Sequence, residues 1–220
     1  GGETYGGLFP DVPGQFNVIL TNPPFGGREG KEAQTSFAYK TGATQVLFLQ
    51  HVIDKLGNGG RCGIVLDEGV LFRTNETAFM QVKRKLLNEC NVWCIVSLPG
   101  GMFTAAGAGV KTNLLFFTKG EQTQQVWYYD LSDVKVNKKN PFTRIQLDGF
   151  FRLLPDRADS EHSWSVTREA IEAKNYDLKA VNPNAKSNAD TRAPEELLDI
   201  IEAKGREVAE ALAALRQKRR

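Results

Sequence analysis

The sequence predicts an α/β fold in which parallel strands alternate with helices, followed by one final antiparallel strand and a helical tail. Over the first half of the 220 residues, short apolar runs alternate with helical patterns, as in strand–helix–strand units with right-handed crossovers. The connection from Leu98 to Asn113 has only about 14 residues and no helical pattern, which is too short for a parallel return and predicts an antiparallel strand. Residues 194–219 carry a long helical pattern of their own.

The first expected elements follow a Gly- and Pro-rich stretch over residues 1–15. Phe16–Leu20 is apolar enough for a short buried strand, and the polar residues 26–42 form a loop long enough to be functional. Thr44–Leu56 has apolar residues at helical spacing. We expect the glycines of residues 57–60 to end this helix with a left-handed cap.

The later elements continue the alternation. They are a strand at Arg61–Leu66, a helix at Glu76–Asn88, strands at Val92–Leu98, Asn113–Thr118 and Gln125–Leu131, and a short helix at Val166–Lys174. We therefore divide the chain into residues 1–133, an α/β domain, residues 134–191, an irregular extension and linker, and residues 192–220, a C-terminal helix.

The C-terminal helix has an apolar stripe. Pro194 suits its first position, and the stripe consists of Leu198, Ile201, Val208, Leu212 and Leu215 at a spacing of three and four residues. This stripe docks either on the body of the protein itself or on a helix of a partner. The polar linker before it is compatible with a partner.

Composition excludes several classes of protein. The net charge of +2 gives no bulk electrostatic reason to bind nucleic acid, so any such surface must be local. The 3 cysteines and 2 histidines are too few and too scattered for a zinc site, so we expect no metal and buried thiols in a reducing cytosol. No apolar run approaches the roughly 20 residues of a membrane span, and no basic-then-apolar leader is present.

The residues Asn22-Pro23-Pro24-Phe25 end the first expected strand and carry the clearest chemistry in the chain. An Asn side chain and a proline carbonyl are two acceptors that can bind both protons of an exocyclic amine on a flat heterocycle, and an aromatic ring beside them can stack on that heterocycle. Consecutive prolines fix φ and remove donors, which holds the Pro23 carbonyl rigid. Ligands bind at the carboxyl ends of parallel strands, which favours this interpretation over an ordinary turn.

The chain resembles the modification subunit of type I restriction–modification systems, a family of adenine-N6 DNA methyltransferases. The resemblance runs from about Phe16 to Gly120 in order and spacing, through the strings NVILTNPPFGG, QVLFLQHVIDKLGNGGRCGIVLDEGVLF and VWCIVSLPGGMFTAAGAGVKTNLLFF. It implies the C-terminal half of a Rossmann-like methyltransferase sheet, S-adenosylmethionine as cofactor, and a cytoplasmic location in a bacterium or archaeon. It also implies DNA and a specificity subunit that contacts the C-terminal helix as partners, and it leaves open whether a restriction subunit joins them.

The same resemblance implies roles for individual residues. Asn22, Pro23, Pro24 and Phe25 are expected to be catalytic, with Asn22 and Pro23 accepting from the adenine amine and Phe25 stacking on the flipped ring. Gly26, Phe103 and Lys111 are expected to line the substrate site, although a packing role for Phe103 fits the sequence equally well. Arg28, Lys31 and Lys40 could contact phosphates, but the neighbouring glutamates favour a solvated loop.

Two features depart from the family pattern. Asp67-Glu68-Gly69 stands where a Pro-Gly step is expected, and only 15 residues precede Phe16, too few for the glycine-rich cofactor turn and the acidic residue of the family. We therefore expect no confident cofactor-binding residue in this chain, and expect this polypeptide alone to be inactive. Its first strand would then be an exposed apolar edge through which copies associate or swap.

Two other functions remain open at this point. One is an amino-methyltransferase that acts on RNA or on protein glutamine, although glutamine enzymes usually carry Tyr at the position of Phe25. The other is a non-catalytic module that binds other subunits through the C-terminal helix.

Overall fold

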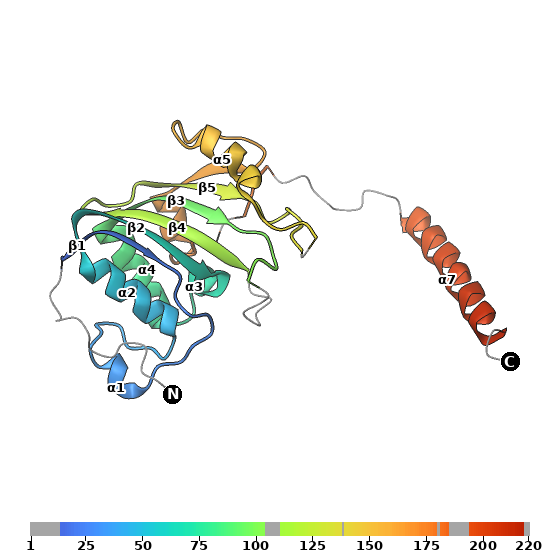
Figure 1. The fold of residues 1–220 in the computed structure, drawn as a ribbon, viewed down its shortest axis with the longest axis horizontal. Coiled ribbons are helices and arrows are strands. Elements are labelled where there is room, and N and C mark those ends of the chain that lie inside the picture. Colours follow the sequence, from blue (N-terminus) through green and yellow to red (C-terminus); the bar gives the residue numbers. More distant parts are fainter. Residues whose placement is uncertain (1–13, 104–110, 138, 180, 185–193, 218–220) are drawn as a thin grey trace. The chain divides into compact units, whose positions relative to one another are not determined.

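The structure, a computed structural model, describes residues 14–103, 111–137, 139–179, 181–184 and 194–217 (Figure 1). It divides into two units, Gly1–Ala185 and Lys186–Arg220. No helix among these residues is long and apolar enough to cross a membrane.

The first unit is built on a mixed sheet of six strands among the described residues. The strands are β1 (Phe16–Thr21), β2 (Leu56–Asp67), β3 (Cys90–Ser97), β4 (Thr112–Lys119), β5 (Gln125–Asp130) and β6 (Ser163–Thr167). Their order in the sheet is β1-β2-β4-β3-β5-β6. The prediction of an α/β fold is confirmed.

The strand β4 runs antiparallel to both of its neighbours, as the short connection before it predicts. Leu114 pairs with Val65 of β2 on one side and with Val96 of β3 on the other. Because β1 is parallel to β2 and β5 is parallel to β3, the strands β1, β2, β3 and β5 all point the same way. Their carboxyl ends therefore share one edge of the sheet.

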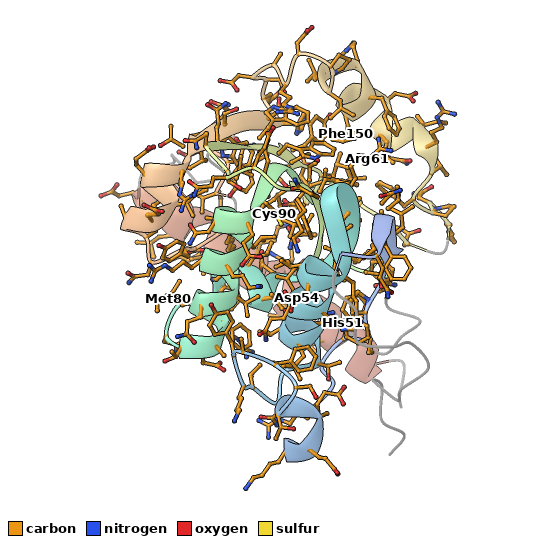
Figure 2. All side chains as sticks on the ribbon, turned by 90° about the vertical axis from the view of Figure 1, so that its left-hand side faces the viewer. His51, Asp54, Arg61, Met80, Cys90 and Phe150 are labelled. Carbon is orange, nitrogen blue, oxygen red and sulfur yellow. The ribbon has the colours of Figure 1, made fainter. Side chains whose placement is uncertain are left out.

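Helices cover both faces of the sheet (Figure 1). The described helices of the first unit are α1 (Lys31–Gln34), α2 (Thr44–Lys55), α3 (Glu68–Phe72), α4 (Thr77–Glu89), the 3-10 helix η2 (Arg144–Leu147), α5 (Asp148–Leu153) and α6 (Arg168–Ala173). Helices α2 and α4 lie on one face and α5 on the other. In Figure 2, Asp54 and Met80 mark the first face and Phe150 marks the second.

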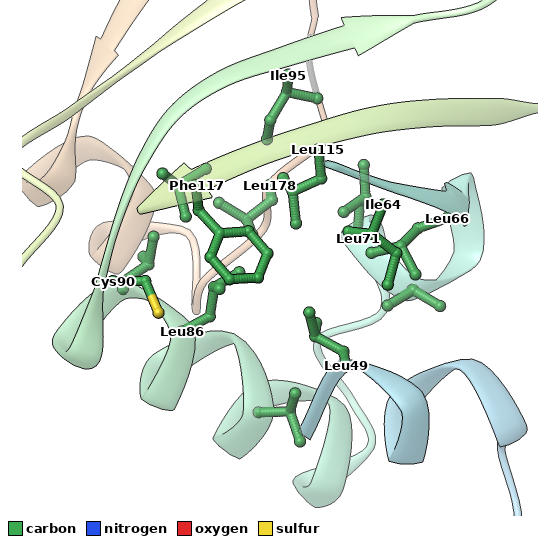
Figure 3. Packing of buried hydrophobic residues seen from close by; sticks show 14 of the residues in the cluster. Leu49, Ile64, Leu66, Leu71, Leu86, Cys90, Ile95, Leu115, Phe117 and Leu178 are labelled. Carbon is green, nitrogen blue, oxygen red and sulfur yellow. The ribbon is translucent and has the colours of Figure 1, made fainter. Parts of the chain in front are cut away.

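Each face has its own hydrophobic core. On the first face, Leu49 of α2 and Leu86 of α4 point toward Leu115 and Phe117 of β4 (Figure 3). On the second face, the ring of Phe150 stacks on Trp127 of β5 at 5.7 Å. Residues of β3, β4 and β5 serve both cores, which explains the consecutive apolar residues in these strands.

The three cysteines are free and buried, as expected. Burial raises the pKa of Cys62, Cys90 and Cys94 to about 12. The thiolate is the reactive form of cysteine, so these side chains are packing residues and not nucleophiles.

The glycines of residues 57–60 do not cap α2, which corrects the expectation from the sequence. Leu56 ends the helix in an extended conformation and already begins β2. A Cβ on Gly60 would lie 2.9 Å from the Phe16 carbonyl oxygen, so this glycine allows the close approach of β1 to β2 at an irregular register.

The segment after residue 133 is more ordered than an irregular extension. The strand β6 pairs with β5, so the boundary expected at residue 133 falls between two neighbouring strands. Within the helix expected at Val166–Lys174, the residues up to Thr167 belong to β6 and α6 begins at Arg168. Thr167 caps α6, since its side chain accepts from the Ala170 N–H.

The strand β1 lies at one edge of the sheet among the described strands. Its side chains Phe16, Val18 and Leu20 are exposed by 41%, 50% and 78%. An apolar edge with unpaired backbone groups is a template for another strand. Self-association through β1 stays a prediction.

The second unit contains the helix α7 (Pro194–Gln217). Leu198, Ile201, Val208 and Leu212 are all exposed on it, while the side chain of Leu215 lies outside the described residues. Glu195 and Glu196 stand in its first turn, where the helix dipole favours acidic groups.

A buried lysine joins α4 to α3. The Lys83 ammonium group, whose side chain is 0% exposed, donates to the carbonyls of Leu71 at 2.7 Å and Arg73 at 2.8 Å. Burial lowers the pKa of Lys83 to about 8, while the negative charge of Asp177 opposes this shift. The Leu178 N–H donates to the same Leu71 carbonyl, so the end of α3 is held from two sides.

Replacing Lys83 should change the pH dependence of stability. The folded-state pKa of about 8 lies below the ordinary value of 10.5, so between these values the unfolded state binds more protons and stability rises with pH. We expect the difference in unfolding free energy between wild type and Lys83→Met to grow by about 2–3 kcal/mol from pH 7.5 to pH 10. Urea unfolding measures it. Lys85→Met is the control, because ion pairs with Glu89 and Asp54 more than offset burial and raise the pKa of Lys85, so its difference should stay constant over this range.

Candidate functional site

The candidate site lies at the edge of the sheet where β1, β2 and β3 end and β4 begins. Asp67 at the end of β2 pairs with Thr112 at the start of β4, and the Glu68 N–H donates to the Lys111 carbonyl at 2.9 Å. Ser97 at the end of β3 pairs with Asn113. The residues that follow β1, β2 and β3 therefore lie at the same edge of the sheet, where ligands of α/β folds bind.

The Asn-Pro-Pro-Phe segment follows β1 at this edge. Asn22 is exposed, Pro23 is buried and Phe25 is half-buried. The amide of Asn22 is thus accessible from solvent, and burial fixes the residue that carries the neighbouring carbonyl. The side chain at position 22 is not sealed inside the core, so it remains available to a ligand.

The structure brings Phe103 to Phe25. Their ring centroids lie 5.4 Å apart with an angle of 50° between the planes. Phe103 also packs against the second core, so it has a packing role in addition. This aromatic contact joins the segment after β1 to the segment after β3, which are far apart in the sequence. The distance between the ring centroids is within the range preferred by aromatic pairs.

Lys111 lies at the same edge but with its side chain exposed. Only its carbonyl has a described contact, with the Glu68 N–H. The backbone of Lys111 therefore helps to join β4 to α3, while its ammonium group is open to solvent. The loop just before it, residues 104–110, lies outside the described residues.

A cavity of about 570 Å³ begins at Gly26 and continues between the loop after β1 and the helices α3 and α4. It is lined by Gly26, Gly27, Arg28, Glu29, Gln34, Thr41, Gly42, Ala43, Thr44, Gln45, Asp67, Val70, Arg73, Glu76 and Phe79. Its wall carries both acidic and basic side chains. Asn22 and Phe25 stand beside this cavity in sequence and are not part of its wall.

The polar loop of residues 26–42 is held in place by hydrogen bonds. The Thr44 hydroxyl donates to Glu29 at 3.0 Å, and the Thr44 N–H donates to the Gly27 carbonyl at 3.2 Å. Gln34 of α1 donates to the Glu29 carbonyl. These contacts fix the loop against the first turn of α2.

Sequence reasoning missed two residues of this site. Gln45 in the first turn of α2 is 3% exposed and contacts the ends of both β1 and β2. Asp67 caps α3 by accepting from the Val70 N–H at 2.9 Å. The sequence does contain signals for both residues. Gln45 is a polar residue beside the apolar stripe of a helix, and Asp67 is an acidic residue just before a short helix, where N-caps occur.

The carboxylates at this edge are already engaged: Glu29 with Thr44, Asp67 with the Val70 N–H, and Glu68 with Lys179 at 3.4 Å. Over the described part of the chain, no group of three or more His, Cys, Asp or Glu side chains could hold a metal ion.

Comparison with known proteins gives a consistent result. The family described as N-6 DNA Methylase matches residues 2–191. The chain is similar to the type I restriction enzyme EcoEI methylase subunit of Escherichia coli, with 35% identity over 92% of the chain and 43% of that protein. It is also similar to the EcoKI methylase subunit of Escherichia coli, with 35% identity over 78% of the chain and 34% of that protein.

Solved structures show the same fold. A chain from a study of complex assembly and conformational transition of the type I R-M system has a TM-score of 0.75 and 37% identity, over 93% of this chain and 45% of that one. A modification subunit of a putative type I restriction enzyme from Vibrio vulnificus YJ016 has a TM-score of 0.71 and 30% identity, over 80% of this chain and 40% of that one. The chain thus spans less than half the length of each of these relatives.

A methyl group on Gly27 should disturb the loop beside the site. A Cβ at this position would lie 2.5 Å from the Thr44 hydroxyl, the group that fixes Glu29, whereas a Cβ on Gly30 would meet no atom within 4 Å. We expect Gly27→Ala to lower the unfolding free energy by about 1–3 kcal/mol, as for other overpacked sites. Gly30→Ala should change it by less than about 0.5 kcal/mol. Denaturant unfolding measures both, and equal losses would contradict the packing argument.

Proposed function

The chain belongs to the N-6 DNA methylase family, and from that premise we propose that it forms the adenine-binding part of a type I restriction–modification methyltransferase. The complete enzyme transfers a methyl group from S-adenosylmethionine to the N6 amine of adenine in DNA. The observation that carries this proposal is the exposed Asn22 beside the buried Pro23 at the carboxyl end of β1, with the rings of Phe25 and Phe103 in contact next to them.

These residues suit an aromatic amine. The lone pair of such an amine is delocalised into the ring, which makes it a weak nucleophile. When the Asn22 side-chain oxygen and the Pro23 carbonyl each accept one amine proton, they favour a tetrahedral nitrogen whose lone pair is directed out of the ring plane. No covalent intermediate with the protein is needed.

The two phenylalanines suit a flat base. Phe25 and Phe103 offer aromatic surface at the mouth of the site, and stacking on a base is worth roughly 1–3 kcal/mol. Gly26 gives access because it has no side chain. The adenine must leave the double helix to reach this place, which costs a few kcal/mol and is offset by stacking and by the two hydrogen bonds.

Apart from the flipped base, we expect only a few basic side chains near the site to contact the DNA, since the net charge of the chain is only +2. Arg28, Lys31 and Lys40 are exposed on the loop after β1 and are candidates for phosphate contacts. Lys111 is exposed at the start of β4 and is a further candidate beside the base.

The cofactor of the proposed reaction is S-adenosylmethionine. The carboxylates at this edge take part in structural contacts, so we assign no described residue to this cofactor. What this chain contributes is the orientation of the acceptor amine.

The proposed partners are DNA, a specificity subunit and a restriction subunit, in the cytoplasm of a bacterium or archaeon. Helix α7 favours a specificity subunit as partner, because the exposed side chains of Leu198, Ile201, Val208 and Leu212 form an apolar stripe suited to another helix. The domain roles follow: catalysis in the α/β part, and docking of a partner by residues 192–220. The match to the DNA methylase family favours DNA over RNA or protein glutamine as the substrate.

Replacing Asn22 in the complete enzyme tests the function. We expect Asn22→Ala to lower kcat about 100-fold or more, because one of the acceptors that orient the amine is lost, while Asn22→Asp retains an acceptor oxygen and loses less. Transfer of labelled methyl from S-adenosylmethionine, with identification of N6-methyladenine, measures it. Asn58→Ala is the control, since Asn58 is exposed at the opposite end of β2. Methylation of RNA or glutamine in place of adenine would contradict the proposal.

Charges on the stripe of α7 test the docking. Ile201 and Val208 are exposed by 65% and 59%, so Ile201→Glu with Val208→Glu should leave the fold intact and abolish assembly with the specificity subunit. Arg206→Glu places the same charge on the opposite side of the helix and should retain assembly. Size-exclusion chromatography of the mixed subunits distinguishes the two, and assembly of both variants would contradict this role.

A further inference from the structure

The side chain of Gln45 connects the ends of two neighbouring strands at the candidate site. Its amide oxygen accepts from the Asp67 N–H at 2.9 Å, and its amide nitrogen donates to the Pro23 carbonyl at 3.4 Å. Both contacts are made by a side chain that is 3% exposed. Gln45 thus joins Pro23, the second residue after β1, to Asp67, the last residue of β2.

The orientation of this amide follows from its neighbours. A backbone N–H can only donate and a carbonyl can only accept, so the oxygen of Gln45 must face Asp67 and its nitrogen must face Pro23. A shorter side chain could not span the two groups, and an apolar one would leave a buried N–H without its acceptor. Glutamine meets both requirements while remaining neutral.

Both ends of this connection are anchored. The first turn of α2 is fixed by Thr44, which contacts Gly27 and Glu29, and Asp67 is fixed by the Thr112 pairing and by its own cap on α3. Gln45 therefore holds the Pro23 carbonyl at a fixed position relative to the end of β2. A carbonyl oxygen has two lone pairs, so the Pro23 carbonyl can accept from Gln45 at 3.4 Å and from a second donor as well.

We propose that Gln45 is a positioning residue that fixes the Pro23 carbonyl in the orientation needed to accept a proton of the target amine. The proposal rests on the proposed function of Asn22 and Pro23. It explains why a buried polar side chain occupies the first turn of α2, on a helix whose other side chains mostly serve the core. An error of about 1 Å in a group that orients a reactant costs on the order of 100-fold in rate, so this one side chain has a large expected effect.

The helix offers a matched control for this role. Gln50 of α2 is 1% exposed and also binds two backbone groups, the N–H and the carbonyl of Tyr39, at 3.0 and 2.9 Å. Its contacts are in the loop and not at Pro23. Loss of Gln50 should therefore destabilise the fold to a similar degree without moving the carbonyl.

The first measurement is kinetic and uses the complete enzyme. We expect Gln45→Leu to lower kcat about 10- to 100-fold while KM for DNA changes less than about 3-fold, because the base still enters the site but its amine is poorly oriented. Gln50→Leu should keep kcat within about 3-fold of wild type.

A second variant separates positioning from stability. Gln45→Glu keeps the shape and the acceptor for Asp67, but its ionised carboxyl cannot donate to Pro23. When that carboxyl is protonated, it can donate again. The activity of this variant relative to wild type should therefore recover as the pH falls from 8 to 6, which a purely structural defect would not show. The charged groups that line the same cavity are Arg28, Glu29, Asp67, Arg73 and Glu76. The three carboxylates and burial raise the pKa of the new carboxyl, and the two guanidiniums lower it.

The third measurement does not depend on activity. Pro23-Pro24 is the one Pro-Pro step in the 220 residues, so the ¹³C signal of the Pro23 carbonyl can be observed through its bond to the Pro24 nitrogen. We expect Gln45→Leu to shift this signal and Gln50→Leu to leave it unchanged.

The outcomes are distinct. A Pro23 signal that is unmoved in Gln45→Leu overturns the proposal, whatever the activity. A shifted signal together with a wild-type enzyme that makes no N6-methyladenine contradicts the proposed function and leaves the connection in place. A shifted signal and an active wild type, with equal kcat for Gln45→Leu and Gln50→Leu, shows that Gln45 has only a structural role.

Discussion

The antiparallel pairing of β4 with both β2 and β3 is the constraint on which the site depends. Because β4 fills the place between two parallel strands, the ends of β2 and β3 are held on either side of its first residues. Lys111, Thr112 and Asn113 therefore meet Asp67, Glu68 and Ser97 at one edge. Because β1 pairs directly with β2, β4 is what fixes the residues after β3 relative to those after β1 and β2.

At this edge of the sheet, which lies beyond the two hydrophobic cores, hydrogen bonds of polar side chains hold the strand ends and α3 in place. Gln45 joins the ends of β1 and β2, Asp67 caps α3, and Lys83 holds the other end of α3 through two carbonyls. Each of these side chains forms hydrogen bonds with backbone groups at the ends of the strands or of α3. Hydrogen bonds thus position the residues of the candidate site, while the two hydrophobic cores stabilise the sheet that carries them.

Local patterns predicted much of the fold. The alternation of strands and helices, the direction of β4 and the limits of α2 and α4 to within about one or two residues all follow from apolar periodicity and loop length. The glycine run after α2 was misinterpreted, because glycine allows both a left-handed cap and a close approach of two strands, and only the position of Phe16 decides between them. The pairing of β6 with β5 was missed since Ser163–Thr167 has no strong period of its own.

The chemical groups of the candidate site follow from the order of residues along the chain: an amide, a rigid carbonyl and an aromatic ring at the end of a strand. These are adjacent along the chain, so their proximity needs no folding. The tertiary structure decided the contact of Phe103 with Phe25 and the connection made by Gln45, because both join residues that are distant along the chain. Local periodicity places a residue on a face of its own element, but the distance between two elements is set only when the sheet has formed.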